Sequence, residues 1–137
     1  TPPNLLQLLK KHGYKYDSSI SSFFPGRYCN LTTSTKPFKK NNIIELPIPN
    51  YFPKLIPAGF SYYRLFYPIS QLFNLKYIFY LHPCEFLEKP MGKDVNFIVR
   101  QFYKVNKGKK AWSIFKNLIS QSNRKWISCQ EYIDSLK

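Results

Sequence analysis

The 137-residue sequence predicts an α/β domain in which helices alternate with short strands. Three observations lead to this prediction. An amphipathic segment that ends at Gly13 is followed at once by a short aromatic segment, as in the helix–strand connection of a parallel sheet. Residues 77–81 are continuously apolar or aromatic, which is typical of a strand buried on both faces. Residues 95–105 and 110–120 have the apolar spacing of amphipathic helices.

The first half of the chain is predicted to contain one helix, two strands and a long loop. Residues 3–12 carry four leucines, and Gly13 stands where a helix usually ends. Residues 14–17 are expected to form a strand. Residues 43–48 are expected to form a second, which a proline restricts to a sheet edge or a strand end. Residues 21–42 show no sustained period, so we expect an ordered functional loop there.

The second half is predicted to be mainly helical. Residues 62–73 read as a helix that Pro68 kinks or splits. A turn separates the two amphipathic helices already described, and residues 126–127 are expected to form a short strand. Ser128 and Glu131 then have the spacing of a capping box that opens a last helix.

The composition excludes a wholly disordered chain and favours anionic partners. Hydrophobic residues make up 44% of the chain, and 21 basic against 7 acidic residues give a net charge of +14. Nucleic acid, acidic polysaccharide or an anionic membrane surface would attract such a chain. An AT-rich genome gives the same excess of Lys, Asn, Ile, Phe and Tyr, so both readings of the charge stay open. No apolar run approaches the roughly 18 residues of a transmembrane segment.

The cysteine pattern slightly favours a reducing, cytoplasmic compartment. Cys29, Cys84 and Cys129 are odd in number and widely spaced, which fits neither a disulfide framework nor a zinc-ligand pattern. The sequence also shows no signal peptide.

His82 is the strongest candidate for chemistry. No complete catalytic or nucleotide-binding motif is present. His82 follows the best predicted strand at its C-terminal end, where α/β sheets and barrels place their sites. An imidazole there can act as a general acid or base near neutral pH. The competing structural reading is a ring that bonds a neighbouring backbone group.

Asp17 and two arginines are further candidates. Asp17 ends the predicted 14–17 strand, where it can orient a cationic or imidazole partner, or cap the following turn. Arg64 and Arg27 are candidates for substrate or anion contacts, with solvated surface as the alternative. The basic residues between the two amphipathic helices lack the interleaved aromatics of a nucleic-acid module, so nucleic acid is the less favoured partner.

These residues resemble a known family. The segments that carry the resemblance are L-L-K-K-H-G-Y-K-Y-D-S-S-I at 8–20, I-I-E-L-P-I at 43–48, P-A-G-F at 57–60, Y-R at 63–64 and Y-L-H-P-C-E at 80–85. In this order and spacing they are similar to the polysaccharide deacetylases. That group is the NodB homology domain, carbohydrate esterase family 4, and its exopolysaccharide-associated subgroup is the most similar. The resemblance covers residues 3–88 well and the last helices, 93–137, loosely.

The resemblance implies a distorted (β/α) barrel, of which residues 1–137 would be the C-terminal portion. It also implies a hydrolase that removes N-acetyl groups from the amino sugars of a polysaccharide or oligosaccharide. In the family a divalent metal, usually zinc, polarises the acetyl carbonyl and activates water. By this resemblance His82 is the general acid, Asp17 the supporting carboxylate and Leu81 the apolar wall of the acetyl pocket. Arg64 is expected to contact substrate.

Two departures from the family pattern limit what this chain is expected to do. The T-F-D-D motif and the H-x-x-x-H motif, which supply the base and the metal ligands, are both absent. A third, minor departure is Cys84, where the subgroup usually has Trp. We therefore expect the C-terminal half of a deacetylase that binds no metal alone, is inactive alone and is prone to self-association. The alternatives are a basic non-catalytic module for acidic polysaccharide or nucleic acid, and a degenerate sugar-binding homologue.

Overall fold

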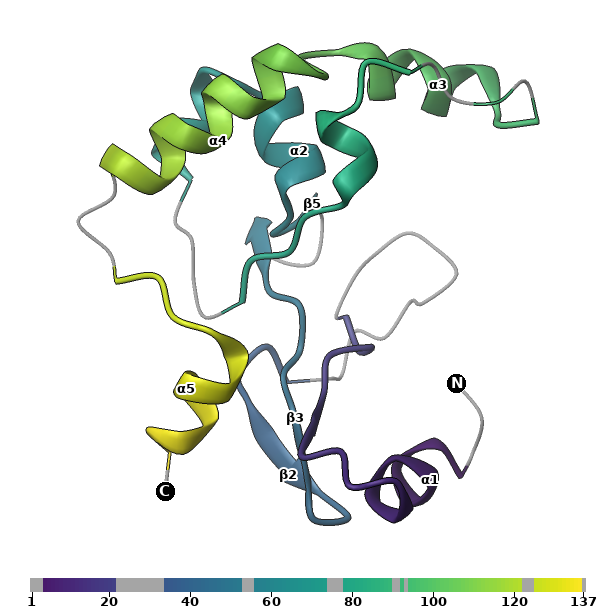
Figure 1. The fold of residues 1–137 in the computed structure, drawn as a ribbon, viewed down its shortest axis with the longest axis vertical. Coiled ribbons are helices and arrows are strands. Elements are labelled where there is room, and N and C mark those ends of the chain that lie inside the picture. The colour runs from purple at the N-terminus through teal and green to yellow at the C-terminus, as the bar shows by residue number, and fades with distance from the viewer. Residues whose placement is uncertain are drawn as a thin grey trace. The chain divides into compact units, whose positions relative to one another are not determined.

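The chain combines helices with short strands, and its helix-and-strand class agrees with the sequence prediction (Figure 1). It divides into two compact units, the first containing residues 1–58, 75–79 and 129–137, and the second containing residues 59–74 and 80–128. The computed structural model describes residues 4–21, 34–52, 56–73, 78–89, 92, 94–121 and 125–136.

The first unit is built on a three-stranded sheet with the order β1–β3–β2. Strand β3, Ile43–Glu45, pairs in parallel with β1, Tyr16–Asp17, and antiparallel with β2, Phe38–Lys40. The parallel pair agrees with the parallel sheet that the helix–strand connection at Gly13 favours, although both strands are shorter than expected.

Strand β2 forms where the sequence analysis expected a loop. Asn41 and Asn42 connect β2 to β3 with positive φ angles of 49° and 62°. Two consecutive left-handed residues make the turn that matches the twist of a two-residue hairpin, and Asn tolerates this conformation well. The loop prediction is therefore wrong at its end, while residues 22–33 lie outside the described residues.

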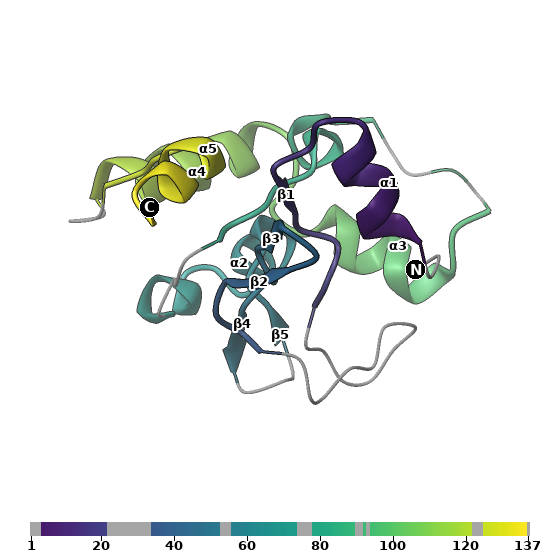
Figure 2. The same ribbon diagram turned by 90° about the horizontal axis from the view of Figure 1, so that it is seen from below.

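Helices and a second sheet complete the first unit. Helix α1, Leu5–Lys11, ends where predicted, and Gly13 follows it with a φ of 78°. Strand β4, Asn50–Phe52, pairs antiparallel with β5, Ile56–Pro57. Helix α5, Cys129–Asp134, is the predicted last helix. Figures 1 and 2 show α1 and α5 on opposite sides of the three-stranded sheet. The buried apolar residues of this unit include Ile43, Leu46, Pro47, Ala58 and Ile133.

The second unit is predominantly helical. Its elements are α2, Phe60–Leu65; the 3₁₀ helices η1, Ile69–Leu72, and η2, Pro83–Phe86; α3, Phe97–Lys104; and α4, Lys109–Gln121. Pro68 separates α2 from η1, as the sequence predicts. Helices α3 and α4 occupy nearly the residues expected for the two amphipathic helices.

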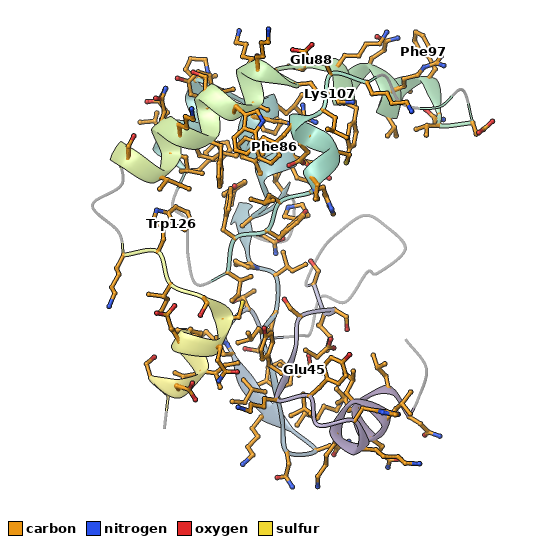
Figure 3. The ribbon with its side chains drawn as sticks, viewed as in Figure 1. Glu45, Phe86, Glu88, Phe97, Lys107 and Trp126 are labelled. Atoms are coloured by element: carbon orange, nitrogen blue, oxygen red, sulfur yellow. The ribbon has the colours of Figure 1, made fainter. Side chains whose placement is uncertain are left out.

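An aromatic cluster forms the core of the second unit. Phe60 of α2 stacks on Phe86 of η2 with ring centroids 5.2 Å apart. Phe86 also packs against Trp112 at 4.4 Å and Phe115 at 5.5 Å, both on α4. Figure 3 shows Phe86 directed toward α4. The cluster attaches η2, and with it the residue that precedes η2, His82, to the two helices.

Two strand predictions are wrong. Within residues 78–81, Tyr80 makes only an isolated parallel bridge with Gly59, so no continuous central strand forms there, and residue 77 is outside the described residues. Residues 126–127 lie outside any helix or strand. No helix in the described part of the chain is both long and apolar enough to cross a membrane.

Candidate functional site

The site that contains His82 is built around the bridge between Tyr80 and Gly59. The amide of Phe60, at the start of α2, donates to the Tyr80 carbonyl at 2.8 Å. A Cβ atom on Gly59 would lie only 2.3 Å from Cζ of the Tyr80 ring, so the ring needs glycine at this position. Burial, together with Tyr62 and Glu85, raises the pKa of Tyr80 to about 12. The phenol therefore stays protonated at neutral pH.

Glu85 fixes the backbone that follows the bridge. Its side chain is fully buried, and one carboxylate oxygen accepts the Ser61 hydroxyl of α2. The other oxygen accepts the His82 amide at 3.3 Å. The backbone of Glu85 donates to the His82 carbonyl at 3.0 Å and accepts from the Gly108 amide at 3.1 Å. Two of these hydrogen bonds close the turn between His82 and Glu85, and the other two tie it to α2 and to Gly108 at the start of α4.

The His82 side chain is exposed at this fixed turn. Its ring lies edge-to-face to the Tyr80 ring, with centroids 5.5 Å apart. Leu81 beside it is 38% exposed. Pro83 occupies the first position of η2, where the missing amide hydrogen costs nothing. The buried Glu85 therefore fixes the backbone of a turn on which the His82 imidazole is accessible next to the apolar side chain of Leu81.

Arg64 is buried, and its described contacts are with the protein. Its Nη1 donates to the carbonyls of Tyr103 and Val105, and the guanidinium lies 5.2 Å from the centre of the Tyr103 ring. The Asn106 side chain in turn donates to the Arg64 carbonyl at 2.6 Å. Burial lowers the pKa of Arg64, and the nearby Glu85 charge opposes that shift. Arg64 thus holds the C-terminal end of α3, while a substrate contact by Arg64 stays a prediction.

The cysteines within the described residues are free thiols. Cys84 is exposed, with its Sγ atom 3.4 Å from the Tyr103 hydroxyl, and Cys129 is partly buried. Burial is the largest of the effects that raise the pKa of Tyr103 to about 12. Cys29 and Arg27 lie outside the described residues.

Asp17 belongs to the first unit, whereas His82, Leu81 and Arg64 belong to the second. Asp17 lies at the end of β1, where the Ser19 hydroxyl donates to its Oδ2 at 2.5 Å. Its register partner in the parallel pair is Glu45 at the end of β3. Paired residues of neighbouring strands share a face of the sheet, so the two carboxylates are neighbours.

Glu45 is the acidic residue that the sequence reasoning did not single out. It is 1% exposed, and neither carboxylate oxygen has a hydrogen-bond partner among the described residues. Burial and the Asp17 charge raise the pKa of Glu45, and Lys40 on β2 opposes the shift. The signal that identifies it is an acidic residue between apolar residues in a predicted strand, I-I-E-L, two positions before Pro47.

The described residues do not supply a metal site. No group of three His, Cys, Asp or Glu side chains comes together in that part of the chain. Three protein ligands are the usual minimum for catalytic zinc. The residues at hand therefore do not fit the metal that the resemblance implies.

The first unit also contains an open cleft of about 540 Å³. Its lining combines aromatic rings, aliphatic side chains and two lysines, with no acidic residue: Tyr14, Lys15, Pro37, Phe38, Lys39, Asn42, Ile44, Ile133 and Leu136. Tyr14, one of the lining residues, is 59% exposed. Such a lining suits an anionic ligand with a flat apolar face.

Comparisons with known proteins give no assignment. The sequence matches no family model and no curated protein, and no solved structure matches the fold.

Proposed function

We propose that the chain contributes the proton-donating part of a polysaccharide deacetylase of the NodB type. The observation that carries the proposal is the His82 turn. It presents an exposed imidazole on a backbone whose amide donates to the buried Glu85, within the segment Tyr80–Glu85 that resembles the family's motif. The complete domain would be a (β/α) barrel with this chain as its C-terminal portion. Its substrate would be a polymer or oligomer of N-acetylated amino sugars.

In the proposed reaction, water adds to the acetyl carbonyl carbon and the carbon–nitrogen bond then breaks. The departing amine nitrogen takes a proton, which His82 donates from its imidazolium form. Leu81 would contact the acetyl methyl group. The structural support for these roles is the exposure of His82 and Leu81 next to each other on a turn with a fixed backbone. The resemblance gives Asp17, in the first unit, the role of the supporting carboxylate.

The metal ligands of this reaction would come from residues other than those described, because the described residues offer no three-ligand group. We therefore expect no bound zinc and no turnover from the 137-residue chain alone. Adding a segment with the family's T-F-D-D and H-x-x-x-H motifs is expected to restore both.

The test compares the chain with such a longer protein. Zinc is measured by elemental analysis, and amine release from an N-acetylated oligosaccharide measures activity. In the active protein, His82→Ala should lower kcat by roughly 10²–10⁴ and leave zinc content unchanged, because a general acid contributes a factor of that size. His12→Ala is the matched control. Loss of zinc in His82→Ala would show that His82 is a ligand and not the acid.

A second function is supported by the cleft of the first unit. Its two lysines, its aromatic rings and the absence of an acidic lining residue favour a binding module for acidic polysaccharide. The double variant Lys15→Gln, Lys39→Gln should weaken binding to polygalacturonate, whereas Lys116→Gln on α4 should not. Wild-type binding should fall steeply with salt. Affinity that does not change with salt would rule this function out.

A further inference from the structure

Helix α3 carries an apolar face that the protein leaves uncovered. None of its eight residues is buried. Ile98, Phe102 and Val105 follow one another at helical spacing on one side, with Val99 beside them, and all four are exposed. These four residues are called the α3 apolar face below. Ile98 is 62% exposed and Phe102 55%, which leaves most of both side chains in water.

The C-terminal end of α3 is fixed by contacts with other residues of the second unit. Arg64 donates to the carbonyls of Tyr103 and Val105, at the end of α3, and its guanidinium covers the Tyr103 ring. The Asn106 side chain closes the same connection from the following turn. In Figure 1, α3 extends away from α2 and α4 of its own unit, and in Figure 3 Phe97 lies at its far end. The α3 apolar face is therefore held out in a fixed orientation.

The polar side of α3 and the turn after it are basic. Arg100 and Lys104 lie one helical turn apart, and the Arg100 guanidinium lies 5.7 Å from the centre of the Phe97 ring. Three lysines follow within six residues of Lys104, at 107, 109 and 110. The residues of the whole second unit include eleven Lys and Arg against three acidic residues. One of those acidic residues is Glu85, which is buried.

We propose that α3 binds the surface of an anionic lipid bilayer, with the α3 apolar face inserted between headgroups and its basic side chains on the lipid phosphates. A short helix with an apolar face and a basic face is the arrangement that lies in a membrane interface. The basic charge of α3 and of the following turn favours an anionic lipid surface as the partner, since basic residues next to a bilayer surface are attracted to anionic lipids. This inference does not depend on the proposed enzymatic function.

The test is co-sedimentation of the 137-residue chain with vesicles. One set contains phosphatidylcholine alone, and the other has one quarter of it replaced by phosphatidylglycerol. Binding to the anionic vesicles is expected, with weak binding to the neutral ones and a marked loss at high salt. The double variant Ile98→Ser, Phe102→Ser should weaken binding at least about tenfold, because both side chains lose the apolar area that would insert.

Leu72→Ser is the matched control, since Leu72 is 87% exposed on η1 of the same unit. All replaced side chains are exposed, so far-UV circular dichroism should not change. Equal binding to the two vesicle types, or equal binding by the double variant and wild type, overturns the proposal. So does light scattering that shows wild-type oligomers which the double variant lacks, because the α3 apolar face would then pair with a second copy.

Discussion

The hydrogen bond between Ser61 and Glu85 provides a direct test of how the His82 turn is held. Glu85 is fully buried, and its carboxylate accepts from the Ser61 hydroxyl and from the His82 amide. Replacing Ser61 with Ala leaves one buried carboxylate oxygen without its donor. Replacing Glu85 with Ala instead removes the acceptor shared by α2 and the His82 backbone.

The expected magnitudes follow from the burial of the pair. A hydrogen bond to a charged group contributes about 1.5–3 kcal/mol, and Ser61 is only half-buried, so Ser61→Ala should lower the free energy of unfolding by about 1.5 kcal/mol. Glu85→Ala should cost about 3 kcal/mol or more, because two donors lose their partner inside the protein. The double variant should cost about the same as Glu85→Ala alone, since the shared bond can be lost only once.

The assay is urea unfolding of the wild type, the two single variants and the double variant. Ser113→Ala, an exposed serine on α4, serves as the control and should change stability by no more than about 0.5 kcal/mol. Additivity of the two single effects to within about 0.5 kcal/mol would refute the reasoning. The Ser61 hydroxyl would then not bond Glu85.

Three further predictions concern titration and close packing. Because burial and Asp17 raise the pKa of Glu45 in the folded chain, the folded state keeps its proton to higher pH than the unfolded state. Stability should therefore fall as pH rises from the unfolded value through the folded pKa, and Glu45→Gln should remove this slope and increase stability at neutral pH. A lower stability of Glu45→Gln than of the wild type at neutral pH would contradict this prediction. Gly59→Ala should destabilise by about 1–3 kcal/mol in urea, since its Cβ would overlap the Tyr80 ring; an unchanged midpoint would show that the ring can move aside. In spectrophotometric titration, Tyr80 and Tyr103 should ionise near pH 12, and Tyr80→Phe should remove one such late step.

The helices of this chain could be predicted from local signals. Gly13 ends α1 because it adopts a left-handed conformation after the last turn. Pro68 separates α2 from η1, and Ala111, Ile114 and Leu118 give α4 its buried side. Each of these effects acts within a few residues, so the pattern in the sequence is sufficient to show it.

The strands and the site depend on partners distant in sequence. Residues 78–81 have the composition of a buried strand, but Tyr80 alone finds a bridge partner, at Gly59. Strand β2 is not evident from the sequence because its apolar content is low, although the pair Asn41-Asn42 is a turn signal.

The roles of Glu45, Glu85 and Arg64 could not be predicted from sequence alone. Burial and hydrogen-bond partners of these side chains arise only when the elements pack. His82 can be identified because a histidine after an apolar run is conspicuous, whereas the bond from its amide to Glu85 appears only in the structure.

The central claim is that His82 faces an N-acetylated sugar, and imidazole NMR of the 137-residue chain tests it most directly. The chain has two histidines, so His12→Ala and His82→Ala assign both signals. Titration with an N-acetylglucosamine oligomer should shift the His82 signals and leave those of His12 unchanged. The fully deacetylated oligomer should produce a smaller shift. Equal shifts of both histidines, or no shift of His82 at saturating oligomer, would contradict the claim.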